Sequence, residues 1–213
     1  MKTQDLVSRL ADDLLPVERG VVEKRFGHAL VIGMTASAGL LALLYGVRGD
    51  MPNPLAMPIF WAKLAFPLAV VAGALKLAGR LARPGARAAF AWTAVAAPVL
   101  AVWLVSALIL WATPHGYRLQ LMLGSTWRSC TLSILLLSLP TFATVMHAMR
   151  SLAPTRLVLA GASVGMLAGA QATLVYAFYC MEMAVPFWGI WYALAMLATT
   201  AAGALLGPKL LRW

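Results

Sequence analysis

The stretch AAFAWTAVAAPVLAVWLVSALILWA, residues 88–112, contains no charged residue in 25 positions. A helix rises about 1.5 Å per residue, so about 20 apolar residues are enough to cross the roughly 30 Å hydrocarbon core of a bilayer. The stretch is therefore long enough to span a membrane as a helix. Helix is the expected conformation because lipid offers no hydrogen-bond partner to a free backbone N–H or C=O group.

Five further apolar segments lie on either side of this stretch, at residues 29–47, 57–78, 131–149, 157–179 and 186–206. Of the 213 residues 62% are apolar and only 11% are charged, whereas about a quarter of an average soluble protein is charged. The segments do not alternate apolar and polar residues as the strands of a membrane barrel do. We predict an all-α integral membrane bundle of six transmembrane helices, formed by residues 27–213.

The basic residues predict how the bundle is oriented. Lys and Arg number 17 against 7 Asp and Glu, a net charge of +10. Thirteen of the 17 lie in the amino-terminal stretch, after the second and fourth segments, or in the tail, and only Arg48, Arg118 and Arg128 lie in the opposite loops. Cytoplasmic loops are rich in Lys and Arg. We therefore expect a multi-pass protein of a bacterial inner membrane with both termini in the cytoplasm, its basic charge set by topology rather than by direct nucleic-acid binding.

The two cysteines are the residues most suggestive of chemistry. Cys130 should open the fourth helix and Cys180 should close the fifth, so both thiols are expected at the outer face, in the oxidising periplasm. Two such thiols can form a disulfide if their Cα atoms come within about 7 Å, or they can bind a soft metal ion as thiolates. The alternative is that each is a small buried apolar residue. We favour a redox-responsive or metal-responsive pair.

Three polar residues near the outer face have open roles. Lys63 is the one charge well inside a segment, where charges are costly and often functional, although its stem is long enough to reach the nearby interface. Glu182 follows Cys180 by two residues and is expected to be either a metal ligand or a solvated loop residue. His115 is a second candidate ligand, so the metal set stays unknown at this point.

Small residues recur at helical spacing in the last two segments. Gly161, Gly165 and Gly169 form one stepped face, and Gly203 and Gly207 repeat the spacing. Such faces let helix backbones approach closely. They predict tight packing between helices, and a homodimer formed through them is a further possibility that the sequence leaves open.

The amino-terminal segment, residues 1–26, is the second functional candidate. Residues 3–15, TQDLVSRLADDLL, place leucines at helical spacing, and Pro16 ends this short amphipathic helix. The segment is close to neutral, whereas a helix lying on anionic lipid is usually basic. A leucine stripe with acidic flanks suits a groove on a partner protein, the alternative being packing on the chain's own cytoplasmic loops. The candidate partner-binding residues are Asp5, Leu6, Leu10, Asp12, Leu14, Pro16 and Val17.

Several longer motifs occur in an order that resembles a known family. They are ADDLLPVER (11–19), STWRSC (125–130), SLAPTR (151–156), YCMEMAVPFWGIWYAL (179–194) and GALLGPKLLRW (203–213). With six apolar segments, this order resembles the NrsF group of membrane anti-sigma factors, which restrain extracytoplasmic-function sigma factors. The resemblance implies that the amino-terminal segment holds a sigma factor inactive. It also implies that Cys130 and Cys180 respond to oxidative or heavy-metal stress.

The sequence thus favours a transmembrane regulator without a cofactor, rather than an enzyme, with a sigma factor and the bilayer as its partners. Two other functions fit the sequence less well. A small-molecule or metal transporter should carry ionisable groups near the bilayer midplane, and these segments are nearly free of them. A membrane thiol oxidoreductase usually needs two cysteines close in sequence, and here they are fifty residues apart.

Overall fold

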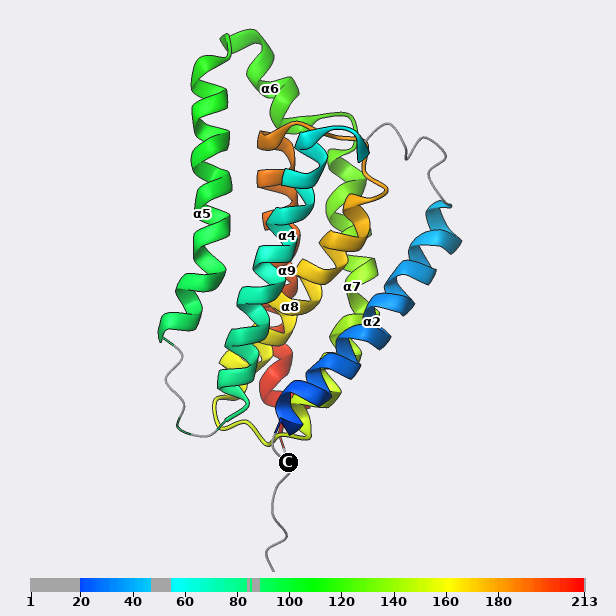
Figure 1. Cartoon of the computed structure of the whole chain (residues 1–213), viewed down its shortest axis with the longest axis vertical. Helices are drawn as coiled ribbons and strands as arrows, with labels where there is room; N and C mark the ends of the chain where they lie inside the picture. The colour runs from blue at the N-terminus through cyan, green and yellow to red at the C-terminus, as the bar shows by residue number, and fades with distance from the viewer. Residues whose placement is uncertain (1–19, 47–54, 84, 86–88, 213) are drawn as a thin grey trace, which may run out of the picture.

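The computed structural model describes residues 20–46, 55–83, 85 and 89–212. These residues form helices and no strand (Figure 1). Six stretches are long and apolar enough to cross a membrane, which confirms the predicted all-α bundle of six spans. The helices are α2 (Val21–Tyr45), α4 (Pro58–Leu81), α5 (Ala89–Ala112), α6 (His115–Leu123), α7 (Trp127–Arg150), α8 (Leu157–Ala177) and α9 (Val185–Leu210).

Some helix boundaries differ from the predicted ones. α2 begins at Val21, eight residues before the first apolar segment, and α9 continues to Leu210. The apolar segments mark only the part of each helix that suits lipid, and helical hydrogen bonding continues past it into polar flanks. The division of the chain at residues 26 and 27 stays a prediction, with α2 starting inside the first part. The predicted amphipathic helix at residues 3–15 lies outside the described residues.

The short helix α6 was not predicted. Its sequence, HGYRLQLML, is too short and too polar to be recognised as a membrane span, and none of its residues is buried. Pro114 precedes its first turn, and the Nε of Arg118 donates to the carbonyl of Thr113 at 2.8 Å. The helix therefore lies across the end of the bundle as a connection between α5 and α7 (Figure 1).

The two ends of the bundle carry different residues, and we call them the cysteine end and the terminal end. The cysteine end holds Cys130 and Cys180, at the start of α7 and just after α8. The terminal end holds the start of α2 and the end of α9 (Figure 1). This arrangement agrees with an even number of crossings.

α8 is the central helix of the bundle, and it packs most closely on α9. About 78% of its most apolar window is buried, more than in any other span. A Cβ on Gly161 would collide with the carbonyl of Gly203, and one on Gly165 would collide with the carbonyl of Thr199. The predicted small-residue faces are thus confirmed, and they are filled within one chain. A homodimer would need a different surface.

α2 is held against the bundle by hydrogen bonds between side chains and backbone carbonyls. Ser37 donates to the carbonyl of Leu137 of α7 at 2.8 Å, and the amide of Gln171 of α8 donates to the carbonyl of Leu30 at 2.8 Å. Such bonds are common where membrane helices pack, because lipid supplies no competing partner. They fix the helix that directly follows the amino-terminal segment.

The packing of α8 on α9 predicts how one methyl group affects stability. Gly165→Ala should destabilise the bundle by about 1–3 kcal/mol, because the new Cβ meets the Thr199 carbonyl rather than a movable side chain. Gly39→Ala is the matched control, since nothing lies within 4 Å of a Cβ built there. Thermal unfolding in detergent should show a lower midpoint for the first variant only. Equal midpoints would contradict the packing.

Candidate functional site at the cysteine end

Both cysteines are buried and both are free thiols. Cys130 lies in the first turn of α7 and is 0% exposed, and its N–H donates to the carbonyl of Thr126 at 3.0 Å. Cys180 lies in the loop between α8 and α9 and is 2% exposed. Its N–H donates to the carbonyl of Tyr176 at 3.0 Å, so the loop leaves α8 through one further helical turn.

The structure brings these two thiols together. The Cys130 side chain lies close enough to Cys180 to act on its thiol, although fifty residues separate them. The hydrogen bond from Cys130 and the nearby Lys63 ammonium lower the pKa of the Cys180 thiol below its ordinary value, while burial opposes them. A thiolate is the form of cysteine that reacts with oxidants and binds soft metals. The pair is therefore arranged for chemistry between its own two sulfur atoms.

Lys63 lies inside the bundle at the cysteine end. Of the two alternatives left open, a functional buried charge or a stem reaching the interface, the structure shows a buried charge: the residue is 0% exposed and its Nζ donates to the carbonyl of Cys180 at 2.6 Å. A buried charge is tolerated only when it is paired or hydrogen-bonded. This partner is 117 positions away in the sequence, so no local pattern indicates it. Lys63 ties α4 to the loop that carries the second thiol.

Aromatic rings surround the thiols. Tyr176 of α8 and Tyr192 of α9 are both buried beside the cysteines, with ring centroids 6.4 Å apart. The hydroxyl of Tyr45 of α2 lies 2.7 Å from that of Ser133, one turn along α7 from Cys130, and the Tyr45 ring lies 5.1 Å from that of Tyr179. The sequence pattern gives no indication that these tyrosines lie beside the thiols, because they come from separate segments. Together the rings shield the pair from water and join four helices around it.

Glu182 connects two loops at this end. Its Oε1 accepts hydrogen bonds from the N–H and the Oγ of Ser125, at 2.7 and 2.6 Å. The neighbouring Gly124 has φ +56°, and a Cβ there would meet both the Glu182 carboxyl and Phe187, so the turn between α6 and α7 requires glycine. The carboxylate is therefore engaged in holding the turn that leads into Cys130.

The described residues contain no group of three His, Cys, Asp or Glu side chains able to hold a metal ion. His115 is exposed at the start of α6. A metal bound at the described part of this end would therefore depend chiefly on the two sulfur atoms. The predicted partner-binding residues, from Asp5 to Val17, lie outside the described residues.

The terminal end contains two contacts that fix the first turns of α2. NH1 of Arg25 donates to the carbonyl and the Oγ of Ser151, just past the end of α7, at 2.9 and 2.6 Å. Arg83, just past the end of α4, forms a 2.6 Å ion pair with Glu23. Both partners of this pair are more than half exposed, so the pair itself contributes little stability. The helices that carry Cys130 and Lys63 thus both reach the start of α2.

Lys63→Met should loosen the loop that carries Cys180, because it removes a charge-assisted hydrogen bond of a buried donor. We expect amide hydrogen exchange of residues 178–184 to accelerate by about tenfold, which corresponds to about 1.4 kcal/mol. Lys76→Met, at an exposed position of the same helix, is the control. The same exchange rate in both variants would show that Lys63 does not hold this loop.

The chain is similar to known proteins over its whole length. A family described as "Negative regulator of sigma F" matches residues 10–213. A protein named "Probable anti-sigma-F factor NrsF" in Azospira oryzae is 42% identical over 213 residues, covering 100% of both chains. The "Anti-sigma-F factor NrsF" of Caulobacter vibrioides is 35% identical over 222 residues, again covering 100% of both. No solved structure matches.

These matches agree with the resemblance found from the motifs. The most specific of those motifs, STWRSC and YCMEMAVPFWGIWYAL, contain the two cysteines that the fold places in contact. A match of this length, with relatives covered from end to end, leaves no part of the bundle outside the similarity. The chain belongs to the NrsF family of negative regulators of sigma F.

Proposed function

We propose that this chain is a membrane anti-sigma factor that binds an extracytoplasmic-function sigma factor through its amino-terminal segment and releases it when its two cysteines react. The name of the family and of the two relatives supports the anti-sigma role. The observation that carries the sensing role is the contact between the thiols of Cys130 and Cys180 at the end opposite to the start of α2. In this proposal the cysteine end faces the periplasm of the inner membrane and both termini are cytoplasmic.

The thiols of Cys130 and Cys180 can react in two ways. A two-electron oxidant takes two electrons and the two thiol protons, and a covalent bond joins the Sγ atoms of Cys130 and Cys180. A soft heavy-metal ion would instead displace the protons and bind both sulfurs as thiolates. Either product replaces a hydrogen bond between two thiols by a stronger and differently shaped link. The disulfide or the bound metal can shift the equilibrium between the sigma-binding and sigma-releasing states only if its free energy differs between these two states.

Two helices connect the thiols to the start of α2. α7 carries Cys130 in its first turn and ends next to Ser151, which Arg25 of α2 contacts. α4 carries Lys63 near its start and ends shortly before Arg83, which pairs with Glu23 of α2. A change in the angle of either helix at the cysteine end would alter these contacts about 30 Å away. Since α2 directly follows the amino-terminal segment, its first turns are where such a change would reach the sigma-binding residues.

The amino-terminal residues Asp5, Leu6, Leu10, Asp12, Leu14, Pro16 and Val17 are proposed to dock on the sigma factor and to block its access to polymerase. A leucine stripe of this spacing buries one helical face in a partner groove. The acidic flanks would contact basic residues at the edge of that groove.

The role of the thiols is tested by replacing Cys130 and Cys180 with Ser, singly and together. Each variant should keep the sigma factor inactive and should no longer release it on treatment with an oxidant or a soft metal ion, since neither product forms with one sulfur. The measurement is transcription from a sigma-dependent promoter, with protein level in the membrane fraction as the control for folding. An undiminished response in the double variant would remove the thiols from the mechanism.

The leucine stripe is tested with two neighbouring substitutions in the full chain. Leu10→Glu should weaken binding of the sigma factor by about thirtyfold, because it removes a central contact that contributes about 2 kcal/mol to the binding free energy. Leu15→Glu makes the same chemical change outside the stripe of Leu6, Leu10 and Leu14, and should bind nearly as the natural chain does. Equal loss in both variants, or in neither, would show that the stripe is not the docking face.

A further inference from the structure

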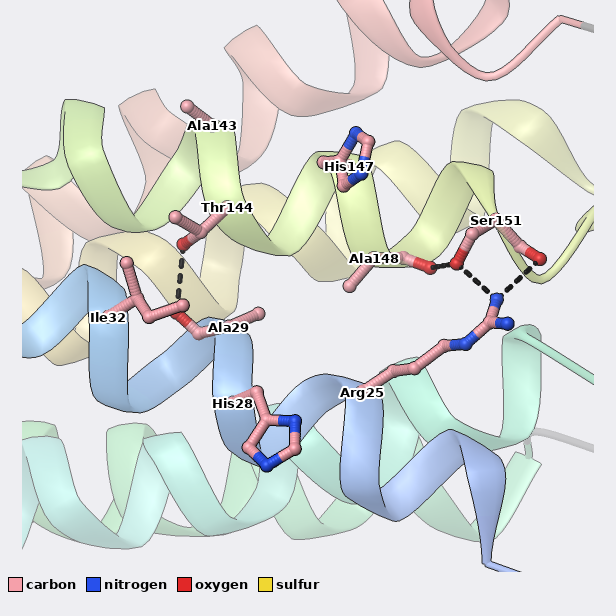
Figure 2. Close-up of a pocket in the computed structure, with 9 residues that line it drawn as sticks. All are labelled: Arg25, His28, Ala29, Ile32, Ala143, Thr144, His147, Ala148 and Ser151. Carbon is pink, nitrogen blue, oxygen red and sulfur yellow. Dashed lines mark hydrogen bonds between the residues drawn. The ribbon is translucent and has the colours of Figure 1, made fainter. Parts of the chain in front are cut away.

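The terminal end carries a groove between α2 and α7, beside the contact of Arg25 with Ser151. Its volume is about 640 Å³, within the range of small-molecule sites. The lining residues are Arg25, His28, Ala29, Ile32, Ala143, Thr144, His147, Ala148 and Ser151. None of them is acidic. Figure 2 shows these side chains on two neighbouring helices, with Arg25 reaching across the gap to Ser151.

The polar groups of the groove gather toward one of its ends. The guanidinium of Arg25 is held in place by Ser151, whose carbonyl and Oγ both accept from the same nitrogen, NH1. Within the part of the chain that the structure describes, its Nε and NH2 groups make no hydrogen bond, so a ligand or water can satisfy them. His28 and His147 lie on the two helices that border the groove (Figure 2), and both are exposed. Among the described residues, neither imidazole forms a hydrogen bond with another side chain.

The other end of the groove is apolar and lies nearer the middle of the spans. Ile32 is 57% exposed there, and Ala29 and Ala143 line the groove beside it. The Oγ1 of Thr144 is already occupied, since it donates to the carbonyl of Ala29 at 2.9 Å. The seven helical steps from Arg25 to Ile32 advance about 10 Å along the helix. The groove therefore changes from cationic to apolar along the axis of the spans, as a phospholipid changes from headgroup to chain.

A second groove at the same end shows the contrast. It lies between α2 and α4 and is lined by Glu23, Lys76, Arg80 and Arg83 among others, and Glu23 neutralises Arg83 within it. Its volume is about 350 Å³. The lining of the α2–α7 groove, by contrast, contains no acidic residue, and charge complementarity favours an anionic ligand there.

We propose that the groove between α2 and α7 binds an anionic phospholipid, with the phosphate at Arg25, His28 and His147 and an acyl chain over Ile32 and Ala143. Basic pockets between membrane helices are known to suit such headgroups. Arg is well matched to phosphate because its planar donors engage two oxygens together. The bound lipid would bridge the two helices whose ends meet at Arg25 and Ser151.

The test is native mass spectrometry of the full chain, delipidated in detergent and titrated with dioleoyl phosphatidylglycerol, dioleoyl phosphatidylcholine or inorganic phosphate. Phosphatidylglycerol should bind at least tenfold more tightly than either of the others. Equal binding of the two lipids would overturn the charge argument. Binding of inorganic phosphate as tight as that of phosphatidylglycerol would show a phosphate site without a lipid role, which also overturns the proposal.

Variants locate the binding within the groove. Arg25→Gln should weaken phosphatidylglycerol binding by about fivefold. Because Arg25 also holds Ser151, the pair His28→Gln and His147→Gln provides a second variant that leaves that contact intact and should weaken binding by a few fold. Lys76→Gln, in the second groove, is the control and should bind as the natural chain does. Unchanged binding in both groove variants would overturn the proposal.

A last variant separates lipid from the chain's own acidic segment as the occupant. Asp12→Asn combined with Asp13→Asn removes two negative charges from the amino-terminal segment. If lipid is the natural occupant, this change should leave the affinity for phosphatidylglycerol as it was. A several-fold gain in affinity would show that the acidic segment competes for the groove and would overturn the assignment to lipid.

Discussion

The close approach of α8 to α9 is the contact on which the rest of the arrangement depends. Gly161 and Gly165 allow the backbones to meet without intervening side chains in the half of α8 nearer the terminal end, and a short loop joins the same two helices at the cysteine end. That loop carries Cys180, and α7 packs on both helices of the pair. With wider spacing, Tyr176 of α8 and Tyr192 of α9 would not enclose the thiols. The two glycine faces thus set the spacing of the helices on either side of the loop that carries Cys180.

Lipid as solvent explains why the polar contacts of this bundle are few and specific. The amide of Gln171, the hydroxyl of Ser37 and the ammonium of Lys63 each donate to a backbone carbonyl of another segment. Each joins parts of the chain that are at least 100 positions apart. In the absence of competing water such bonds fix which helix lies beside which. Two of them hold α2, the helix next to the amino-terminal segment, and the third holds Cys180.

Much of the fold was predictable because it follows from hydropathy. Six apolar runs of sufficient length, and glycines at helical spacing in the last two, predicted the spans and the tight packing between helices. The helix α6 was not predicted because its nine residues are amphipathic and too short to be recognised as a span. The start of α2 at Val21 was not predicted because the first turns of the helix, which include Glu23, Lys24 and Arg25, are not apolar.

The site was predictable only in part. Because successive spans run in opposite directions, Cys130 at the start of the fourth span and Cys180 at the end of the fifth were predicted at the same end of the bundle. Hydropathy, however, does not specify which helices are neighbours. Contact between the thiols, burial of Lys63 on the Cys180 carbonyl, and the groove at Arg25 all depend on that order. The partners involved are distant in sequence, so no local motif records them. The role of the amino-terminal residues rests on their pattern and on the family.

The central claim is that two thiols far apart in sequence are neighbours within one folded chain. The most direct measurement is peptide mapping, without reduction, of the full-length protein after brief oxidation with diamide in membrane vesicles. We expect one cross-linked peptide pair that joins Cys130 to Cys180 within a monomer. Cross-links between chains, or two thiols that stay reduced while the bundle remains folded, would contradict the account.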